Sequence, residues 1–422
     1  MKSKFKQTDN SDDSTSLTTG IPKGWDFRGI SEIADNFDSK RIPLSGRERA
    51  KRQGVYPYYG AASIIDHIDD YIYDGKYLLI AEDGTVSDKN GRPTLQLTND
   101  KFWVSNHSHV LKCEDDNETK YLYYVLSSIS VIPFLTGSVQ LKLSQANLNR
   151  INIPYPPKEE RSKITEILSS LDAKIELNRR MNETLESIAQ AIFKRWFVDF
   201  EFPDKNGKPY KSSGWKMVDS ELGEIPQGWQ LSNLGESGTF KNGINYLRDE
   251  VGDTDFFIAN VRDIANNKLL LKGSLDKIRI NLSKAKEYLL QEKDILIARS
   301  ASPGEISLVL GDLEKVIYSG FSIRYRLNNP NNYLYIFHIM QGLKKNLQNY
   351  SIGTTLQSVN QETLKNMEFV LPPAKILEEF NKISEQILDK ILNNLIQNKD
   401  LSQIRDFLLP RLMSGKIMVE VN

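Results

Sequence analysis

The sequence has little of what disulfide-linked, metal-binding and membrane proteins need. A single cysteine, Cys113, stands among 422 residues, and only four histidines occur. One cysteine excludes an intramolecular disulfide framework and a zinc site built of thiolates, so we expect a reducing, cytoplasmic setting. No run of about 18 apolar residues is present, so no membrane-spanning helix is expected. Residues 1–20 are polar and lack the apolar stretch of a secretory signal, and we expect a disordered leader there.

An excess of charge of either sign is missing as well. Lys and Arg total 55, and Asp and Glu also total 55, which gives a formal net charge of zero. This balance excludes a uniformly basic coat but not local basic faces, because net charge averages over the whole surface. Hydrophobic residues at 39% and charged residues at 26% are typical of a globular protein. The length predicts two or three domains.

Motifs for bond-making chemistry are also missing. The sequence contains no phosphate-binding loop, no G-x-G-x-x-G after a strand, no H-E-x-x-H and no G-x-S-x-G. His107 and His109 alternate along a predicted strand without a third ligand nearby. Such a pair is more typical of a polar recognition face or of plain packing than of a metal site. We therefore expect no catalytic residue, no metal site and no enzymatic activity.

What the sequence does contain is a repeat. IPKGW at residues 21–25 returns as IPQGW at 225–229, KYLLIA returns as KDILIA, and the stretch ending in Pro156-Pro157 returns in one ending in Pro372-Pro373. The matching blocks keep their order while the spacers differ in length, which indicates a common scaffold with variable loops. Each copy has short β-type runs punctuated by Gly, Asn, Asp and Pro, interrupted by a few helical stretches. Each copy therefore predicts an α+β domain.

A long helix is predicted after each of these domains. Pro-Pro marks its start, because proline is tolerated only in the first turn. Apolar residues recur at alternating steps of three and four, the seam of a coiled coil. The seam residues are Ile164, Ile167, Leu171, Met181, Leu185, Ile188, Ile192, Phe380, Ile383, Ile387, Leu401, Ile404 and Leu408.

Two asparagines interrupt this seam, Asn178 in the first helix and Asn394 in the second. A buried asparagine costs stability but fixes the register of a coiled coil, since its amide needs a polar partner. We expect the two helices to pair antiparallel, with the two asparagines facing each other. A surface position with a different seam is the alternative.

The two copies differ in the polar residues that could contact nucleic acid. The first has a basic segment, KRIPLSGRERAKR, followed by aromatic residues, and the second has Arg and Asn, which are suited to bidentate contacts with guanine and adenine. The alternatives are a solvated charged loop in the first copy and a salt bridge from Arg262 to Asp263 or another acid in the second. The candidate DNA-binding residues are Lys40, Arg41, Arg47, Arg49, Lys51, Arg52, Tyr58, Tyr59, His107 and His109, then Lys241, Asn242, Asn260, Arg262, Arg299, Ser300 and Arg324.

Taken together, these motifs resemble the specificity subunits of type I restriction–modification enzymes. The resemblance rests on IPKGW and IPQGW, YPYYGAASIID, YLLIAEDGTV, VSNHSHVL, DILIARSASPG and the Pro-Pro helix starts, and it extends from Ile21 to Ile417. One departure is Ala301, where the family commonly has glycine.

The resemblance implies two similar target recognition domains separated by a long antiparallel two-helix coiled coil, with a pseudo-twofold internal repeat. Each domain would read one half of a bipartite, gapped DNA target, while the helix pair sets the gap and docks two methyltransferase subunits. Trp196 and Phe197 are candidate docking residues, or else cap the coiled coil. The expected segments are a leader at 1–20, domains at 21–157 and 225–373, helices at 158–200 and 374–422, and a linker at 201–224.

The resemblance also implies where the chemistry takes place. S-adenosylmethionine would belong to the methyltransferase subunits, and ATP and Mg to a restriction–motor subunit, with none of them bound by this chain. Two rival interpretations stay open at this point. One is a pseudo-symmetric coiled-coil adaptor that holds two protein partners without sequence-specific DNA binding, and the other is an autonomous methyltransferase or nuclease.

Overall fold

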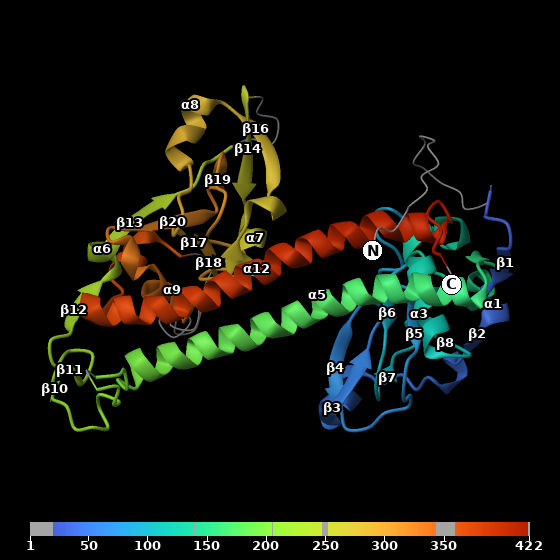
Figure 1. Ribbon diagram of the computed structural model, residues 1–422, viewed down its shortest axis with the longest axis horizontal. Helices are drawn as coiled ribbons and strands as arrows, with labels where there is room; N and C mark the ends of the chain where they lie inside the picture. Colours follow the sequence, from blue (N-terminus) through green and yellow to red (C-terminus); the bar gives the residue numbers. More distant parts are fainter. Residues whose placement is uncertain (1–19, 139, 205, 247–251, 343–358, 421–422) are drawn as a thin grey trace. The chain divides into compact units, whose positions relative to one another are not determined.

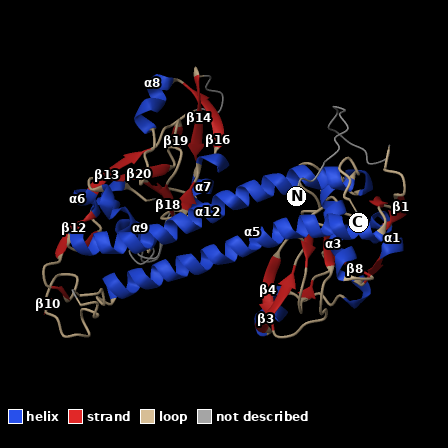
Figure 2. Cartoon of the chain, in the orientation of Figure 1, coloured by secondary structure: helices blue, strands red, loops and turns tan. Residues whose placement is uncertain are grey.

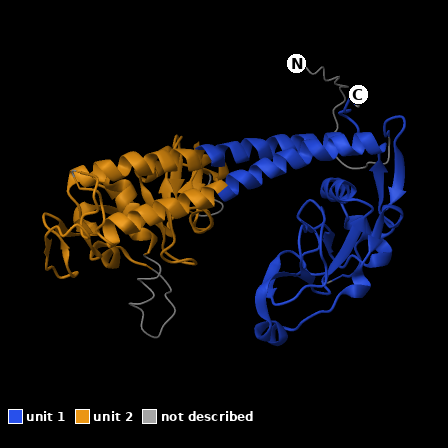
Figure 3. Ribbon diagram, turned by 60° about the horizontal axis from the view of Figure 1, so that its bottom comes forward, with its two compact units in different colours: residues 1–180, 393–422 blue, residues 181–392 orange. Residues whose placement is uncertain are grey.

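The computed structural model describes residues 20–138, 140–204, 206–246, 252–342 and 359–420. All but the last residue of the predicted leader lie outside these ranges. The chain divides into two compact units, which Figure 3 distinguishes by colour. Unit 1 consists of residues 1–180 and 393–422, and unit 2 of residues 181–392. Within the described ranges, no helix combines the length and the apolar character needed to span a membrane.

Unit 1 is built on an antiparallel sheet with the strand order β2-β8-β5-β6 and a three-stranded sheet with the order β4-β3-β7 (Figure 1). A two-stranded ribbon, β1-β9, closes the domain. The strands are β1 (Asp26–Gly29), β2 (Ala34–Asn36), β3 (Gln53–Tyr59), β4 (Ile64–Ile68), β5 (Leu78–Ala81), β6 (Leu95–Leu97), β7 (Trp103–Val104), β8 (Ser108–Cys113) and β9 (Asn152–Tyr155). The helical elements are α1 (Ile30–Ile33), η1 (Asp38–Lys40), α2 (Gly46–Lys51), α3 (Asp116–Ser128), η2 (Ile132–Phe134), α4 (Gln145–Leu148) and the first part of α5 (Lys158–Phe193).

Unit 2 has the same layout with one more strand in its main sheet, whose order is β13-β20-β17-β18-β15. Its three-stranded sheet has the order β16-β14-β19, and its ribbons are β12-β21 and β10-β11. The strands are β10 (Met217–Val218), β11 (Ile225–Pro226), β12 (Gln230–Asn233), β13 (Gly238–Asn242), β14 (Thr254–Ala259), β15 (Leu269–Leu270), β16 (Asp276–Ile280), β17 (Ile295–Ala298), β18 (Ile306–Val309), β19 (Val316–Tyr318), β20 (Ser322–Leu327) and β21 (Glu368–Leu371). The helical elements are the last part of α5, η3 (Lys194–Val198), α6 (Leu234–Ser237), α7 (Val261–Asn266), η4 (Lys272–Ser274), α8 (Leu282–Ala285), η5 (Lys286–Tyr288), η6 (Pro330–Asn332), α9 (Tyr333–Gln341), α11 (Gln361–Lys365) and the first part of α12 (Ala374–Met413), whose residues 393–413 belong to unit 1.

The pairing of the strands confirms that the sequence repeat is a structural repeat (Figure 2). In unit 1, β8 pairs antiparallel with β5, opposing Ala81 and Ser108, and in unit 2, β20 pairs with β17, opposing Ala298 and Ser322. Each three-stranded sheet combines one antiparallel and one parallel pair, β3 with β4 and β7, and β14 with β16 and β19. The chain is therefore an α+β protein in which one domain architecture occurs twice.

The central strand of each main sheet is buried on both faces, which explains its unbroken apolar sequence. All four residues of β5, and all four of β17, are buried. In unit 1 the side chains alternate between a core shared with α3 and the helix pair and a second core shared with the three-stranded sheet. A strand covered on both faces has no polar side, so KYLLIA and KDILIA show no two-residue alternation.

Within unit 1, the parts of α5 and α12 pair antiparallel, as predicted. The side-chain Nδ2 of Asn178 donates hydrogen bonds to Oε1 of Gln397 at 2.7 Å and to Oδ1 of Asn398 at 2.9 Å. One end of the pair is further joined by Arg405, which donates to Asp172 at 2.8 Å. Asn178 is fully buried. These two partners of Asn178 lie about one helical turn from Asn394. The hydrogen bonds of Asn178 therefore do not match the prediction that it directly faces Asn394.

Within unit 2, the helices pair through aromatic residues. Phe380 of α12 is fully buried, and its ring centroid lies 4.8 Å from that of Phe197 and 6.0 Å from that of Trp196. Phe197 also packs against Trp229, the tryptophan of IPQGW. Trp196 and Phe197 are 8% and 7% exposed and belong to the core of unit 2. Their assignment as docking residues is therefore corrected, and the alternative, an internal packing role at the end of α5, holds.

The predicted seam is only partly right. Ile164 and Phe380 are fully buried, but Ile188, Ile383 and Ile404 are 44%, 40% and 48% exposed. The buried set instead includes Leu168, Ala189, Leu388, Ile391 and Leu409. The reason is that each helix packs on its own domain as well as on the other helix, so the buried stripe is wider than a coiled-coil seam and faces a different direction.

Candidate nucleic-acid interface

In each unit, three segments meet at one edge of the main sheet, and all of them except the one after β5 carry predicted recognition residues. In unit 1 these are the end of β2, the residues after β5 and the start of β8, because β8 runs antiparallel to both neighbours. We call this edge 1. In unit 2 the equivalent segments are the end of β13, the residues after β17 and the start of β20, and we call this edge 2. The same topology therefore presents different side chains at an equivalent place.

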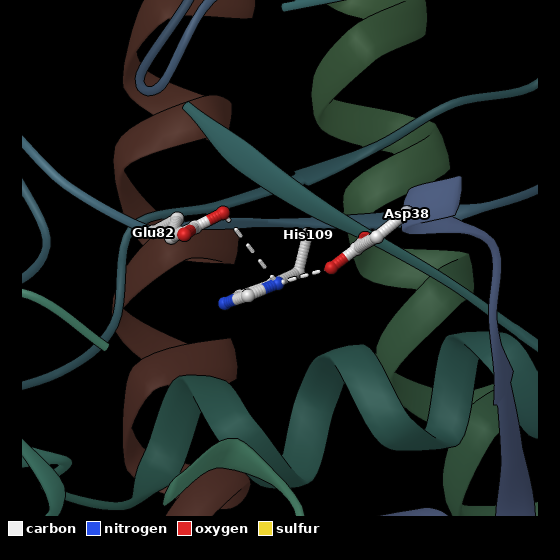
Figure 4. Close-up of side chains that lie close together, drawn as sticks. All are labelled: Asp38, Glu82 and His109. Atoms are coloured by element: carbon white, nitrogen blue, oxygen red, sulfur yellow. Dashed lines mark hydrogen bonds and ion pairs between the residues drawn. The ribbon is translucent and has the colours of Figure 1, made fainter. Parts of the chain in front are cut away.

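Edge 1 is organised around His109, which is 1% exposed (Figure 4). Its Nδ1 lies 2.6 Å from Oδ2 of Asp38, and its Nε2 lies 2.8 Å from the carbonyl oxygen of Leu143. A carbonyl only accepts hydrogen bonds, so Nε2 carries a proton, and the Asp38 carboxylate favours a second proton on Nδ1. His109 is therefore a buried imidazolium that joins β8 to the segments of Asp38 and Leu143.

The electrostatics of this group support a charged imidazole. Burial alone would lower the pKa of His109, but the hydrogen bonds to Asp38 and to the Leu143 carbonyl outweigh it, and the pKa is raised above its usual 6.5. Burial would raise the pKa of Asp38, but the hydrogen bond and charge of His109, the hydrogen bond from the Val110 amide and the charge of Arg41 together lower it. Each partner thus holds the other in its ionised form.

Two cations complete the network. Arg41 donates to Oε2 of Glu82 at 2.9 Å and to the carbonyl oxygen of Ser108 at 2.8 Å. Lys142 pairs with Oε1 of Glu82 at 2.9 Å. Burial would raise the pKa of Glu82, but these two hydrogen bonds lower it. Arg41, a predicted DNA contact, is thus committed to holding the residues after β5 against the start of β8.

Asp38, Glu82 and His109 are the group of described residues whose spacing would suit a metal ion. One ligand atom each from Asp38, Glu82 and His109 lies within 4.8 Å of the others. Both ring nitrogens of His109 are already hydrogen-bonded, and Glu82 is neutralised by two cations. Coordination would require the imidazolium to lose a proton and a hydrogen bond. These contacts favour an ion-pair network, and the absence of a metal site stays a prediction.

The basic segment of unit 1 divides into paired and unpaired side chains. Arg49 pairs with Asp66 at 3.0 Å and covers the ring of Tyr58, while Arg52 pairs with Asp69 at 2.9 Å. These contacts fasten α2 to the three-stranded sheet. Tyr58 is 1% exposed, and its hydroxyl accepts a hydrogen bond from the Leu44 amide. Tyr58, like His109, thus lies in the framework behind the surface.

The exposed cations of this segment lie on or beside α2. The side chains of Arg47 and Lys51 are exposed and make no hydrogen bond or ion pair with any described residue. Lys40 is exposed beside the ring of Phe37, and Tyr59 is half-buried against Phe102. Unpaired exposed cations lose no internal contact when they bind phosphate. Arg47 and Lys51 are therefore the basic residues of unit 1 best placed for DNA.

Unit 2 shows the same division. Arg262 pairs with Asp276 and, at 3.6 Å, with Asp263, so the salt-bridged alternative holds for this residue. Asn260 begins α7, where its backbone amide donates to Asp263 at 2.8 Å. Lys241 pairs with Glu287 at 3.0 Å. These three predicted contacts have structural partners at the surface.

The remaining predicted residues of unit 2 lie at edge 2. Asn242 is exposed and accepts a hydrogen bond from Gln361 at 3.0 Å. Arg299 and Ser300 follow β17, and the Arg299 guanidinium is exposed without an ion pair to any described residue. Arg324 is 8% exposed, and its Nε has no hydrogen-bond partner among the described residues. Edge 2 thus carries cations that no acid of the described ranges neutralises.

Sequence reasoning missed Asp38, Glu82 and Lys142, whose roles depend on contacts between distant segments. It also missed Phe321, which is 67% exposed and directly precedes β20. A signal for Phe321 was present, because VSNHSHVL and YSGFSIRY share two serines that place Phe321 at the position of His107. The backbone strain at Ala301, whose φ is +62°, also lies at edge 2 and explains why glycine is favoured there.

Comparisons with known proteins agree with this organisation. A family model described as the type I restriction modification DNA specificity domain matches the chain twice, over residues 22–187 and 226–405. The type I restriction enzyme MjaIX specificity subunit of Methanocaldococcus jannaschii is 31% identical over 447 aligned positions, which cover 99% of this chain and 98% of that protein. The type I restriction enzyme HindI specificity subunit of Haemophilus influenzae is 27% identical over 64% of this chain and 70% of its own length.

A solved structure shares the fold. The crystal structure of the type I restriction–modification S subunit from M. genitalium matches with a TM-score of 0.57 and 17% identity, covering 97% of this chain and 99% of that one. The two family matches correspond to the two copies of the repeat.

Proposed function

We propose that the chain selects the DNA sequence on which a type I restriction–modification complex acts. The basis is its family, because the chain belongs to the type I restriction–modification DNA specificity subunits. The observation that carries the proposal is the contrast between edge 1 and edge 2. One framework presents a histidine-centred network at edge 1 and, at edge 2, two arginines, Arg299 and Arg324, without an ion pair to a described acid. Two modules with a shared fold and different edge residues are suited to reading two different short sequences, the halves of a bipartite target.

In this proposal the helix pair serves as a ruler and as a docking surface. Several large apolar side chains on the helices of unit 1 are exposed, and a surface of this kind favours a protein partner. They are Leu177 at 52%, Ile396 at 51%, Ile404 at 48% and Phe407 at 56% exposed. We assign this surface to methyltransferase subunits, two per chain because the repeat supplies two related surfaces. A restriction–motor subunit would be a further partner.

The chain itself would then be non-catalytic. Methyl transfer from S-adenosylmethionine would take place on the methyltransferase subunits, and ATP and Mg would be used by the motor subunit. The complex would work in the cytoplasm, where the DNA lies. Transfer of labelled methyl groups by the purified chain alone would contradict this division of labour.

Salt dependence distinguishes DNA reading from a protein adaptor. Binding of the chain with its methyltransferase partner to a target duplex should weaken steeply as salt increases, because phosphate contacts release counterions. The same complex should bind a duplex with a scrambled half-site more weakly by about 1–3 kcal/mol per mismatched base pair. Equal binding to both duplexes, with protein assembly intact, would favour the adaptor.

The proposal that the helix pair sets the length of the gap has a separate test. Inserting four residues after Asn178, about one helical turn, lengthens α5 by about 6 Å at 1.5 Å per residue. A matching insertion in α12 after Gln397 keeps the two helices in register within unit 1. A complex of the doubly extended chain with its methyltransferase subunits should methylate a target with a longer gap and the same half-sites. An unchanged gap with full activity would refute the ruler.

A further inference from the structure

The turn before β20 has a counterpart before β8, which allows the two edges to be compared position by position. Ser322 opposes Ala298 as Ser108 opposes Ala81. Three residues earlier, the Ser319 amide donates to the carbonyl of Ala259 at 3.0 Å, as the Ser105 amide does to Tyr59 at 2.9 Å. The residue before the strand is therefore structurally equivalent in the two units. It is His107 at edge 1 and Phe321 at edge 2.

Phe321 is 67% exposed, more than any other described phenylalanine or tryptophan. A phenyl ring in water forgoes the stabilisation of burial, and no hydrophobic core cluster of the described residues includes it. Its backbone is nevertheless held firmly. The Phe321 carbonyl accepts from the Arg299 amide at 2.9 Å, and the neighbouring Gly320 amide donates to Ile244 at 2.8 Å. The ring is thus presented to solvent on a fixed support.

The Gly320 position shows how closely the support is packed. A Cβ atom there would lie 2.0 Å from Oδ1 of Asn245 and 3.3 Å from the Ile244 carbonyl oxygen, so a larger residue would require the Asn245 side chain to move. The turn that carries Phe321 is therefore fastened to both neighbouring segments. Such a support favours a side chain that acts as a rigid wedge rather than one that folds onto the protein surface.

Two arginines belong to the strands at this turn, Arg299 directly after β17 and Arg324 within β20. Arg299 is exposed and unpaired with any described acid, and Arg324 is almost fully buried without an acidic partner among the described residues. By contrast, Arg326, two residues along β20, pairs with Asp294 at 2.6 Å. A buried guanidinium without a counter-charge is costly, so Arg324 gains most from an anion brought by a ligand. At edge 1, the position of Arg299 is held by Glu82.

We propose that Phe321 inserts its ring at a base step of the DNA half-site read by unit 2, with Arg299 and Arg324 facing the adjacent phosphates. The inference rests on the proposed function and names a contact that edge 1 does not have. Apolar wedges between base pairs and arginines on flanking phosphates are a known combination in DNA-binding proteins, because the wedge opens the stack while the cations hold the backbone. A protein partner would use the ring but would not need two uncompensated guanidiniums.

The test uses the full chain in complex with its methyltransferase subunits and a duplex containing the motif found by sequencing methylated adenines. 2-Aminopurine replaces, one at a time, the bases of the half-site that unit 2 is proposed to read. Its fluorescence increases where a base is unstacked. The wild-type complex should increase the 2-aminopurine fluorescence at one base step that does not include the methylated adenine. Phe321→Ala should remove that rise and weaken binding by about 5- to 150-fold, the loss expected for one base–aromatic stack. Phe321→Leu should keep part of both effects, since leucine also serves as a wedge.

Salt titration separates the ring from the charges. Phe321→Ala should leave the dependence of log K on log salt unchanged, whereas Arg299→Ala should reduce its slope by about one. Leu282→Ala is the matched control, because Leu282 is an exposed apolar residue of unit 2 at the start of α8. That control should change neither fluorescence nor affinity.

Three results that would contradict the proposal can be distinguished. If the wild-type complex binds motif and scrambled duplexes equally, the proposed function itself is wrong. If wild type discriminates between them but Phe321→Ala matches wild type in fluorescence and affinity, only the wedge is refuted. Loss of methyltransferase assembly in Phe321→Ala, with unchanged DNA binding by the assembled fraction, would instead assign the ring to a protein contact and also overturn the inference.

Discussion

Replacing Asn178 with alanine should loosen the helix pair of unit 1 by about 1–3 kcal/mol. Asn178 is fully buried and donates to Gln397 and Asn398 at 2.7 and 2.9 Å. Gln397 is exposed and regains water when the bond is lost, but Asn398 is half-buried and keeps an unsatisfied oxygen. The expected cost is that of one buried acceptor left without a donor.

Asn178→Leu is the informative comparison. Oδ1 of Asn178 has no hydrogen-bond partner among the residues that the structure describes, so the native residue already includes an unsatisfied buried oxygen. Leucine removes that oxygen and fills the same space, which offsets the lost bonds. We expect Asn178→Leu to be closer to wild type than Asn178→Ala, while fixing the register of the helices less strictly.

Amide hydrogen exchange measures this locally, which suits a chain with two units. Exchange from peptides of α5 around residues 172–180 should be about 5- to 150-fold faster in Asn178→Ala under conditions where local opening limits exchange. Peptides of β5, in the core of unit 1, should change less. Exchange in Asn178→Ala equal to wild type, or a larger loss of protection in Asn178→Leu than in Asn178→Ala, would refute the reasoning.

Three further predictions concern the two domains. The raised pKa of His109 means that its ionised form stabilises unit 1 fully below about pH 6.5, and that this stabilisation is lost as the pH rises through the higher pKa of the folded state. The melting temperatures of wild type and His109→Gln, measured from pH 6 to 9, should therefore converge at high pH. A constant difference between the two melting temperatures would contradict this. The double variant of Arg47→Ala and Lys51→Ala should reduce the salt slope of DNA binding by up to about two without changing the recognised motif, and an altered motif in methylation sequencing would show base reading instead. Phe380→Ala should destabilise unit 2 by about 3–5 kcal/mol, because the ring is fully buried between Phe197 and Trp196; a denaturant midpoint equal to wild type would rule out this packing.

Local chemistry made the framework predictable from the sequence. Pro-Pro excludes continuation of a helix from before it, and the two long helices begin at Lys158 and Ala374, directly after these pairs. The doubly buried strands were visible as short apolar runs bounded by turn residues. Similar blocks in the same order then predicted one architecture used twice, because a matching sequence pattern imposes matching burial.

The identity of the free cations could not be predicted in this way. Arg47, Arg49, Lys51 and Arg52 look alike in the sequence, yet two of them are held by acids that lie 17 residues further along the chain. Whether one of these cations forms an ion pair depends on how α2 packs against β4. That contact between distant segments cannot be inferred from the basic segment alone. The helix seam failed for a similar reason, since the face that packs on the domain cannot be separated from the face that packs on the other helix.

Sequencing the methylated adenines of genomic DNA, with and without this chain, tests the central claim most directly. The comparison should be made in cells that keep the methyltransferase subunit at the same level. We expect one asymmetric motif in two parts, separated by an unread gap, which vanishes when the chain is deleted and changes in one half only when residues 21–137 are exchanged for those of a related protein. A motif that persists without the chain, or one that is contiguous and changes as a whole on exchange, would contradict the account.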